Sequence, residues 1–531
     1  MRANLSLLAG YGNPAAVRSP TEVTVKNDKR TIFGWAMYDW ANSAYSTVIA
    51  GAILPSYFVA EVVGEGEKWN GWSGESLWGL ITGGGALMLF LAMPVLGAIA
   101  DFSGSKLRFL RAFAYGGSLF TTMLFFAGTG DVLFTLGFFL LAQIGFVGAN
   151  VFYDGFLPDI TTDDTIDKVS SRGFALGYVG GGIYLAVVFA AIQLAPDSDA
   201  SALAARIGIG GTGLWWAGFS TFAFRRLRET GEASPLPNDI SVPRVAVLLT
   251  GGLAAILVAG LAGLVLGPAT GVSFGWIAWP IALAIVAWVL VASIAARRMR
   301  GQGDARLYRP SRRTAKLAAI GFRRTWETGR KLLGFKHLLL FVIAYMLYND
   351  GVQTTINISA VYGTETLGLE TATIALTFLV VQFVAFGGAL FFGWLAGRID
   401  IKRAIQINLV VWVGIALAAY QLPAETPMAF LGLGVVIGVV LGGVQALSRS
   451  LYGSMIPEEA SAEFYGFYSV FSKFSAIFGP IIFSIVGRAS DSGRPAILSI
   501  IGFFVVGLTV FSFVDIQAAR QSRQRWAFDD A

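Results

Sequence analysis

Long apolar runs separated by short polar segments dominate the chain. The first run extends from about Thr31 to Val59. Thirteen more follow at about 76–100, 107–128, 132–157, 171–195, 206–224, 244–267, 272–296, 337–361, 371–397, 404–421, 428–447, 464–487 and 496–515. A helix needs roughly 20 apolar residues to cross a bilayer. The pattern therefore predicts an all-α polytopic membrane protein with about fourteen transmembrane helices.

Composition supports this class and narrows the chemistry. The 531 residues are 55% hydrophobic and 14% charged, whereas a soluble domain has about 25% charged residues. The chain has no Cys and a single His, His337, which excludes thiolate nucleophiles and metal sites built from Cys or from a His cluster. No GxxxxGK[ST] phosphate loop occurs, which disfavours an ATP-driven pump. We expect no cofactor and no metal.

Basic residues are unevenly distributed between the connecting segments. Counted from an inside N-terminus, the inside segments hold Lys106, Arg108, Arg111, Lys168, Arg172, Arg225, Arg226, Arg228, Arg297, Arg298, Arg300, Arg398, Lys402, Arg403, Arg520, Arg523 and Arg525. The outside segments are mostly acidic; only Arg488 and Arg494 oppose the trend. The positive-inside rule predicts cytoplasmic tails at 1–30 and 517–531. We separately expect the membrane to be a prokaryotic inner membrane. The net charge of +6 fits contact with membrane lipid and is no indication of nucleic-acid binding.

Residues 297–336 form the most basic segment, with thirteen of the 39 Lys and Arg residues and two acids, Asp304 and Glu327. Apolar residues are scattered among these charges. One interpretation is an amphipathic helix on the inner membrane surface; the alternative is a solvated linker.

The segments on either side of this basic linker repeat one another. Asp39-x-x-Asn42 in the first apolar run corresponds to Asp350-x-x-Gln353 in run 337–361. A Gly-containing basic turn and a Pro followed by an acid occur in both parts in the same order. Internal repeats are typical of transporters. The pattern predicts two six-helix halves, 31–228 and 337–516, with two additional helices inserted in 229–296.

The first basic turn, G-x-x-x-D-x-x-G-x-K-x-R from Gly97 to Arg108, resembles the signature loop of the major facilitator superfamily, although Phe102 replaces a usual basic residue. The segments that begin at Tyr38, Tyr348, Gly443 and Ala462 are similar to the vacuole-effluxer-like branch of that superfamily. The resemblance covers about 31–228 and 337–516. It implies the major facilitator fold, amino-acid export from the vacuole in fungal members, and an unresolved substrate in prokaryotic members.

Polar residues within the apolar runs are candidates for a substrate or ion pathway, because ionisable groups at membrane depth are costly and commonly functional. The candidates are Asp39, Asn42, Tyr45, Asn349, Asp350, Gln353, Asn357 and Lys473. Lys473 with a carboxylate would suit a zwitterion, and Asp350, or else Asp39, would carry a coupling proton. The alternatives are helix–helix hydrogen bonds and a static Lys473–Asp ion pair.

Charged residues at the inside helix ends, together with glycines of the same turns, are candidates for gating between the halves. They are Gly97, Asp101, Gly104, Lys106 and Arg108 in the first half, and Gly393, Arg398, Asp400, Lys402, Arg403 and Arg449 in the second. Arg449 would pair with Glu458, Glu459 or Glu463. The alternative is that these residues only anchor the loops inside.

The pattern as a whole favours a secondary active transporter that moves a small solute, such as an amino acid, as a monomer by alternating access. Coupling to an ion, H⁺ above all, is expected. A lipid scramblase or a non-transporting sensor on the same fold is the alternative. An enzyme would have only carboxylate pairs to work with, such as the acids between Asp159 and Asp167, so we expect no enzymatic activity.

Overall fold

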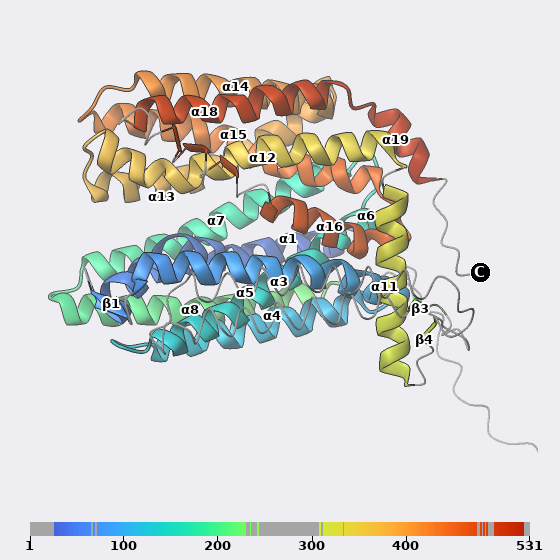
Figure 1. Ribbon diagram of the computed structural model, residues 1–531, viewed down its shortest axis with the longest axis horizontal. Coiled ribbons are helices and arrows are strands. Elements are labelled where there is room, and N and C mark those ends of the chain that lie inside the picture. The colour runs from blue at the N-terminus through green and yellow to red at the C-terminus, as the bar shows by residue number, and fades with distance from the viewer. Residues whose placement is uncertain are drawn as a thin grey trace, which may run out of the picture.

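The computed structural model describes residues 26–64, 67–69, 72–229, 234, 242–243, 307–308, 312–332, 334–474, 478–479, 482–483, 485–486 and 493–524. The predicted inserted helices at 244–267 and 272–296 lie outside the described residues. The described helices form two layers, an N-terminal half and a C-terminal half, that lie side by side along their length (Figure 1).

The first half begins with one long helical segment in which α-helical and wider π-helical turns alternate. Helix α1 (Lys29–Ala44) is followed by π-helical η1 (Tyr45–Ala52), α2 (Ile53–Tyr57) and π-helical η2 (Phe58–Gly64). Asp28 caps the start by accepting the N–H of Thr31 at 2.9 Å, and this bond lowers the pKa of Asp28. Pro55 has no N–H for the preceding turn, and a widened turn is one way for a helix to accommodate that loss.

The remaining long helices of the first half are α3 (Gly74–Phe102), α4 (Lys106–Met123), α5 (Val132–Gly155), α7 (Ile166–Gln193) and α8 (Ser198–Phe224), with the short α6 (Leu157–Ile160) and η3 (Leu124–Phe126). The second half comprises α12 (Lys336–Val361), η7 (Tyr362–Thr366), α13 (Thr371–Ile399), α14 (Ile401–Gln421), α15 (Pro427–Met455), η8 (Glu458–Ala460), α16 (Ser461–Phe474), α18 (Gly493–Ser512) and α19 (Ile516–Arg523). The structure also has two small antiparallel pairs: β1 (Lys68–Trp69) with β2 (Trp72–Ser73), and β3 (Val242–Pro243) with β4 (Leu307–Tyr308).

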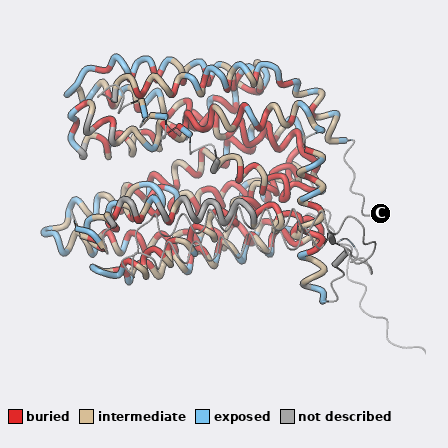
Figure 2. Tube along the Cα trace, viewed as in Figure 1, coloured by how far each residue is buried: buried red, intermediate tan, exposed pale blue. Residues whose placement is uncertain are grey.

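Each half has its own hydrophobic core. One buried cluster is drawn from the helices of the first half and the other from those of the second. Large apolar side chains on the outer surfaces are exposed, among them Leu119, Leu214, Val410 and Leu417. A lipid solvent accounts for such surfaces, because it imposes no cost on apolar exposure. Buried residues concentrate where the halves meet near α11 (Arg313–Leu332) (Figure 2).

Within the described residues, eight helices are long and apolar enough to cross a membrane, or nine if the bent pair α11–α12 forms one span. The all-helical polytopic architecture is thus confirmed, whereas the predicted count of fourteen helices is not. The predicted run 464–487 corresponds in part to α16, which is described over Ser461–Phe474.

Helix α11 (Arg313–Leu332) lies in the basic segment and makes an angle of 94° with α12. It crosses one end of the bundle (Figure 1). Its buried residues Ala319 and Ile320 pack with Phe102 of α3, while Trp326 on another face is 63% exposed. We call this end of the molecule, where α11 and α19 lie, the gate end.

A gate and a cavity between the two halves

A cavity of about 290 Å³ lies between the halves, and we call it the central cavity. Helices α1 and α7 line it from the first half, and α12, α13 and α15 from the second. Most of its lining is apolar. Its polar lining residues are Asp39, Ser43, Ser46, Thr47, Tyr178, Thr355, Ser359, Tyr362, Thr377, Gln382 and Gln445. Asp39 is the one ionisable carboxylate among these lining residues.

The central cavity continues away from the gate end. A space of about 690 Å³, the vestibule, shares Ser46, Thr47, Ile356, Phe378 and Gln382 with it. The vestibule extends along η1 and α2, which follow α1 in the direction opposite to the gate end. The two halves are therefore apart at this end, with the central cavity at the bottom of the opening.

A third space of about 210 Å³, the polar cavity, lies on the gate side and shares Phe174 and Gln445 with the central cavity. Its lining is rich in amides, hydroxyls and charges: Asn150, Asp154, Tyr345, Tyr348, Asn349, Gln353, Ser448, Arg449, Tyr468, Ser469 and Ser472. The Tyr178 hydroxyl donates to Gln445 Oε1 at 2.6 Å, so this boundary is also a contact between the halves.

Arg449 of α15 binds two carboxylates of the other half. Its Nη1 lies 3.2 Å from Asp39 Oδ2 and 3.2 Å from Asp154 Oδ1. Tyr153 also donates its hydroxyl to Asp39 Oδ2, at 2.9 Å. Only 4% of the Arg449 side chain is exposed. One guanidinium thus faces one buried and one partly buried carboxylate, which leaves this cluster one positive charge short of neutrality when both acids are ionised.

The remaining donors of Arg449 are also used. Its Nε donates to Ser170 Oγ at 3.0 Å and its Nη2 to the Ser170 carbonyl at 2.9 Å. The guanidinium lies 4.0 Å from the ring centroid of Phe174 and 4.9 Å from that of Trp35. Gly173 allows this close packing, because a Cβ there would collide with Trp35 and approach both Asp39 and Arg449.

A second set of contacts joins the halves at the gate end. Lys106 Nζ lies 2.8 Å from Asp159 and 3.2 Å from Asp101, and it donates to Ser461 Oγ of the second half at 2.6 Å. Asp101 accepts the N–H groups of Ala462 and Glu463, at 3.3 and 2.9 Å. A carboxylate is favoured there, because the first N–H groups of a helix are unpaired and carry partial positive charge.

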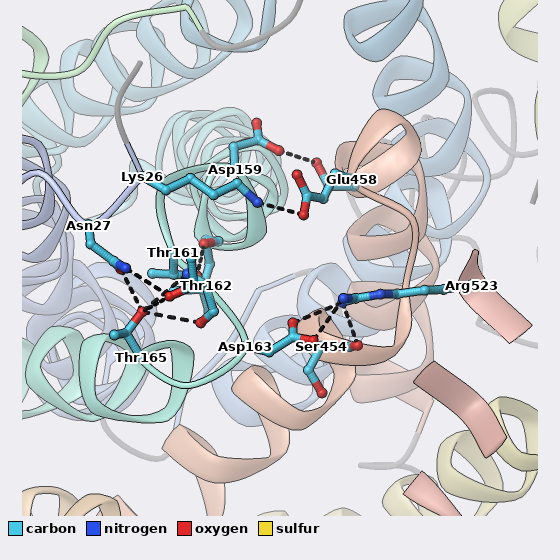
Figure 3. A network of polar contacts seen from close by, with 12 residues as sticks. Lys26, Asn27, Asp159, Thr161, Thr162, Asp163, Thr165, Ser454, Glu458 and Arg523 are labelled. Carbon is cyan, nitrogen blue, oxygen red and sulfur yellow. Dashed lines mark hydrogen bonds and ion pairs between the residues drawn. The ribbon is translucent and has the colours of Figure 1, made fainter. Parts of the chain in front are cut away.

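Closer to solvent, a further network joins the N-terminal residues, the segment after α6, the second half and α19 (Figure 3). Lys26 binds Glu458 at 2.6 Å, and Arg523 binds Asp163 at 2.8 Å. Arg523 also donates to the Ser454 carbonyl at 2.8 Å. The gate end is therefore closed by three successive layers: the Arg449 cluster, the Lys106 cluster and this surface network.

The predicted pathway residues fall into different environments. Asn42 donates to Asn150 Oδ1 at 2.6 Å, and Tyr45 donates to Gln143 Oε1 at 3.0 Å. Both residues thus make helix–helix hydrogen bonds, which the sequence analysis gave as the alternative to a place in the substrate pathway. Neither residue lines the central cavity. Asn349 and Gln353 line the polar cavity, and Asn357 lines the vestibule. The side chain of Lys473 lies outside the described part of the chain, which leaves the Lys473–Asp pair untested.

Asp350 is buried, with 2% of its surface exposed. Its Oδ1 accepts the Gly479 N–H at 2.9 Å and the Thr354 hydroxyl at 3.4 Å. It does not line the central cavity, the polar cavity or the vestibule as the described residues define them. The two repeated acids therefore differ: Asp39 faces the cavity and a cation of the other half, whereas Asp350 accepts its described hydrogen bonds within its own half.

The gating residues also differ between the repeats. Gly97, Asp101 and Lys106 join the two halves, Gly104 turns the chain with φ 54°, and Arg108 is exposed. In the second half, Arg449 binds the first half as described above, and Gly393 of the second basic turn lies against Ser171 of the first half. Lys402 donates to the Ser512 and Val514 carbonyls of its own half at 2.8 and 2.7 Å, and the exposed residues there are Arg398, Asp400 and Arg403. Gly397 occupies the position that corresponds to Asp101, so the second turn lacks the acid that anchors the first.

The predicted partners of Arg449 were wrong. Arg449 binds Asp39 and Asp154, whereas Glu458 binds Lys26 and Glu459 is exposed. Asp154 was missed, although a sequence signal exists. It lies within the apolar run 132–157, four residues after Asn150, so both project from one helical face.

The two layered helical halves, the cavity between them and the charged contacts across one end define an integral membrane transporter of the major facilitator class. The chain belongs to the Atg22-like vacuole effluxer family: the family model described as "Vacuole effluxer Atg22 like" matches residues 80–524. This confirms the family that the motifs indicated.

Individual relatives agree. The chain is 27% identical to the uncharacterized MFS-type transporter YxiO of Bacillus subtilis (strain 168), over 92% of this chain and 96% of that protein. It is 26% identical to autophagy-related protein 22-1 of Aspergillus niger over 37% of this chain and 35% of that protein. Among solved structures, the proton:xylose symporter XylE bound to 6-bromo-6-deoxy-D-glucose superposes with a TM-score of 0.58 over 92% of this chain and 95% of that chain. At 12% identity, this likeness shows the fold.

Proposed function

We propose that the protein is a secondary active transporter that moves a small amino-bearing solute, such as an amino acid, by alternating access. One observation carries this proposal: Asp39 lines the central cavity and is also bound by Arg449 of the opposite half. Any cationic group that enters the cavity and binds Asp39 competes with Arg449. Occupancy of the cavity is thereby linked to the contact that closes the gate end.

The distribution of basic residues supports a cytoplasmic gate end. Lys26, Arg225, Lys336 and Arg523 lie at or beside the ends of helices there, as the positive-inside rule requires of a cytoplasmic face. With this orientation, both tails are cytoplasmic and the described conformation is open to the outside. The prokaryotic inner membrane is the location that we propose.

The chemistry of the cavities favours an amino acid over an anion or a sugar. The Arg449 cluster holds two carboxylates and one guanidinium, so a substrate ammonium supplies the missing positive charge. Amides and hydroxyls of the polar cavity can accept or donate hydrogen bonds to a carboxylate group. A central cavity of about 290 Å³ suits a small solute, since pockets for larger drug-like ligands span about 300–1,000 Å³.

A proton can neutralise the same excess charge when no substrate is bound. Asp39 and Asp154 share one guanidinium, so a proton added to either carboxylate would balance the charge of the cluster. We therefore place coupling by H⁺ at this pair. Asp350 is less suited to that role, because it lines none of the three cavities. The structural relative XylE is described as a proton symporter, which is consistent with H⁺ coupling on this fold.

The topology completes the proposal. We retain fourteen helices, with two inserted helices in 229–296 between six-helix halves at 31–228 and 337–516, acting as a monomer. A reporter fused after Asp530 should read cytoplasmic, and a tag in 266–272 should read external. The opposite result at either position would refute this topology.

A thermal-shift screen followed by counterflow in liposomes tests the function. We expect purified protein to be stabilised by one or more amino acids, because a ligand that binds only the folded state raises the melting temperature. The same amino acids should exchange across liposomes containing the protein. Asp39→Asn should lose both effects, whereas Asp163→Asn, which alters only the surface network, should keep them. Stabilisation by sugars or organic anions alone would contradict the proposal.

A further inference from the structure

Glu463 is a buried acid that the transport cycle proposed above does not use. It lies in the first turn of α16, and 0% of its surface is exposed. Its backbone N–H donates to Asp101 of the other half, so the residue lies at the contact between the halves that closes the gate end. Neither carboxylate oxygen has a hydrogen-bond partner among the described residues.

Helix α11 covers this carboxyl group. Thr328, Arg324 and Glu327 of α11 lie close to Glu463. The Arg324 cation attracts an ionised Glu463 carboxylate, and the Glu327 carboxylate repels it. The Thr328 hydroxyl is fully buried and, within the described chain, also has no hydrogen-bond partner. The Arg324 guanidinium lies 5.0 Å from the ring centroid of Phe102, which fixes it beside α3. A protonated carboxyl group and the Thr328 hydroxyl are complementary, since each can donate or accept one hydrogen bond.

The charged and titratable groups around Glu463 do not neutralise it. Asp101 of α3 and Glu327 of α11 are negative, and the Tyr452 hydroxyl of α15 is neutral. Lys106 is positive but is bound to Asp101 and Asp159. Arg324 of α11 is the cation that acts on Glu463, while Glu327 is bound by Arg323 at 2.9 Å. An ionised carboxylate in this setting is costly because it is desolvated, lacks hydrogen bonds and faces two like charges.

We infer that Glu463 is a proton-binding site of the gate: its carboxylate takes up one H⁺ from the solution at the gate end when the halves close there, and releases it when they separate. No bond other than the O–H bond forms or breaks, and the proton comes from water on that side. The inference rests on the alternating access of the proposed function. It depends neither on the substrate nor on coupling at Asp39.

The direction of the pH effect follows from linkage. The closed gate binds one more proton at Glu463 than the open gate, in which water reaches the carboxylate. A low pH at the gate end therefore favours closure, and a rising pH favours opening. The site would slow the cycle when the solution on that side becomes acidic, independently of the substrate.

The absence of Cys from the sequence makes a direct test simple. Spin labels at Arg225→Cys, at the end of α8, and Lys336→Cys, at the start of α12, report the separation of the halves at the gate end; both positions are exposed. In full-length protein without substrate, the distance should be short at low pH and should lengthen as pH rises. Glu463→Gln, which mimics the protonated form, should keep the short distance across the pH range. The matched control Glu459→Gln, which changes an exposed acid of the same end, should titrate like the parent.

A second variant keeps the test decisive if Glu463→Gln does not fold. Arg324→Gln removes the cation that favours the ionised form, so it should move the midpoint of opening to higher pH. A Glu463→Gln protein that opens at the parental midpoint, or an Arg324→Gln protein with an unchanged midpoint, would overturn the inference. If the parent distance responds to a stabilising amino acid but not to pH, the proton site is refuted while alternating access stands. If it responds to neither, both fail.

Discussion

Asp39 and Arg449 are 410 positions apart in the sequence, yet their side chains meet at 3.2 Å between the two halves of the protein. The same carboxylate faces the central cavity. A contact that holds the gate end closed therefore includes a group that a solute can reach from the other end. This arrangement gives the protein a physical link between binding and closure, and it makes the Arg449 cluster the most informative place to perturb.

Replacing Arg449 should be more damaging than replacing either of its acids. Arg449→Met leaves Asp39 and Asp154 buried without a cation, and breaking a buried pair in this way costs about 3–5 kcal/mol. Asp39→Asn leaves Arg449 bound to Asp154 and should cost less. Melting temperatures of the purified variants measure the order. Arg398→Met, which removes an exposed guanidinium 5.2 Å from the Trp394 ring centroid, is the control and should change little. Equal melting temperatures for Arg449→Met and Arg398→Met would contradict the assignment.

The two lysines of the repeated turns should have different effects. Lys106 joins Asp101 and Asp159 to Ser461 across the halves, whereas Lys402 binds carbonyls of its own half. Lys106→Met should therefore shift the protein toward the form that is open at the gate end. Lys402→Met should leave that equilibrium unchanged and lower stability by about 1 kcal/mol. The spin-label distance between positions 225 and 336 distinguishes these outcomes. An identical distance distribution for both variants would contradict the role of Lys106 in closing the gate end.

Closure of the gate end also requires a small residue at position 97. A Cβ at Gly97 would collide with the Ala462 carbonyl at the start of α16, whereas a Cβ at Gly116 of α4 would meet nothing within 4 Å. Gly97→Ala should therefore favour separation of the halves at the gate end, and Gly116→Ala should not. The measurement is the labelling rate of a cysteine placed at Ser461 in each background. That position is fully buried when the gate is closed, so faster labelling reports separation of the halves. Equal labelling rates in the two backgrounds would rule out this packing requirement.

The outermost ion pairs should contribute little. The Arg523–Asp163 and Lys26–Glu458 pairs are partly exposed, and such pairs are worth about 0–1 kcal/mol and are screened by salt. Arg523→Gln should lower the melting temperature slightly at low salt, and this difference should vanish in high salt. A large loss that persists at high salt would show that the contact between Arg523 and the Ser454 carbonyl, rather than the ion pair, is the important one.

Local patterns in the sequence predicted the all-helical membrane architecture, because a membrane helix is defined by its own apolar run. They also placed Asp39, Asp101 and Lys106 among the functional candidates. The pairing of Arg449 was not predictable in this way. Its partners come from α1 and α5 of the other half, and only the packing of the halves brings them together. Glu458 and Glu463 are nearer to Arg449 in the sequence, but Glu458 binds Lys26 and Glu463 lies beside α11.

The internal repeat was informative about architecture and misleading about chemistry. Asp350 matches Asp39 in its motif, but its described hydrogen-bond donors are Thr354 and Gly479, and it lines no described cavity between the halves. The second basic turn has Gly397 where the first has Asp101, so Lys402 turns to carbonyls of its own half. Repeated backbones impose the same helices, whereas each side-chain site depends on what the opposite half presents to it.

Competition between the solute and Arg449 for Asp39 is the central feature of the proposed cycle, and a binding isotherm tests it most directly. The measurement compares the affinity of a stabilising amino acid for the parent protein and for Arg449→Met. Removal of the competing guanidinium should tighten binding by about tenfold, equivalent to about 1.4 kcal/mol, while Asp39→Asn should abolish binding. Unchanged or weaker binding by folded Arg449→Met would contradict the competition.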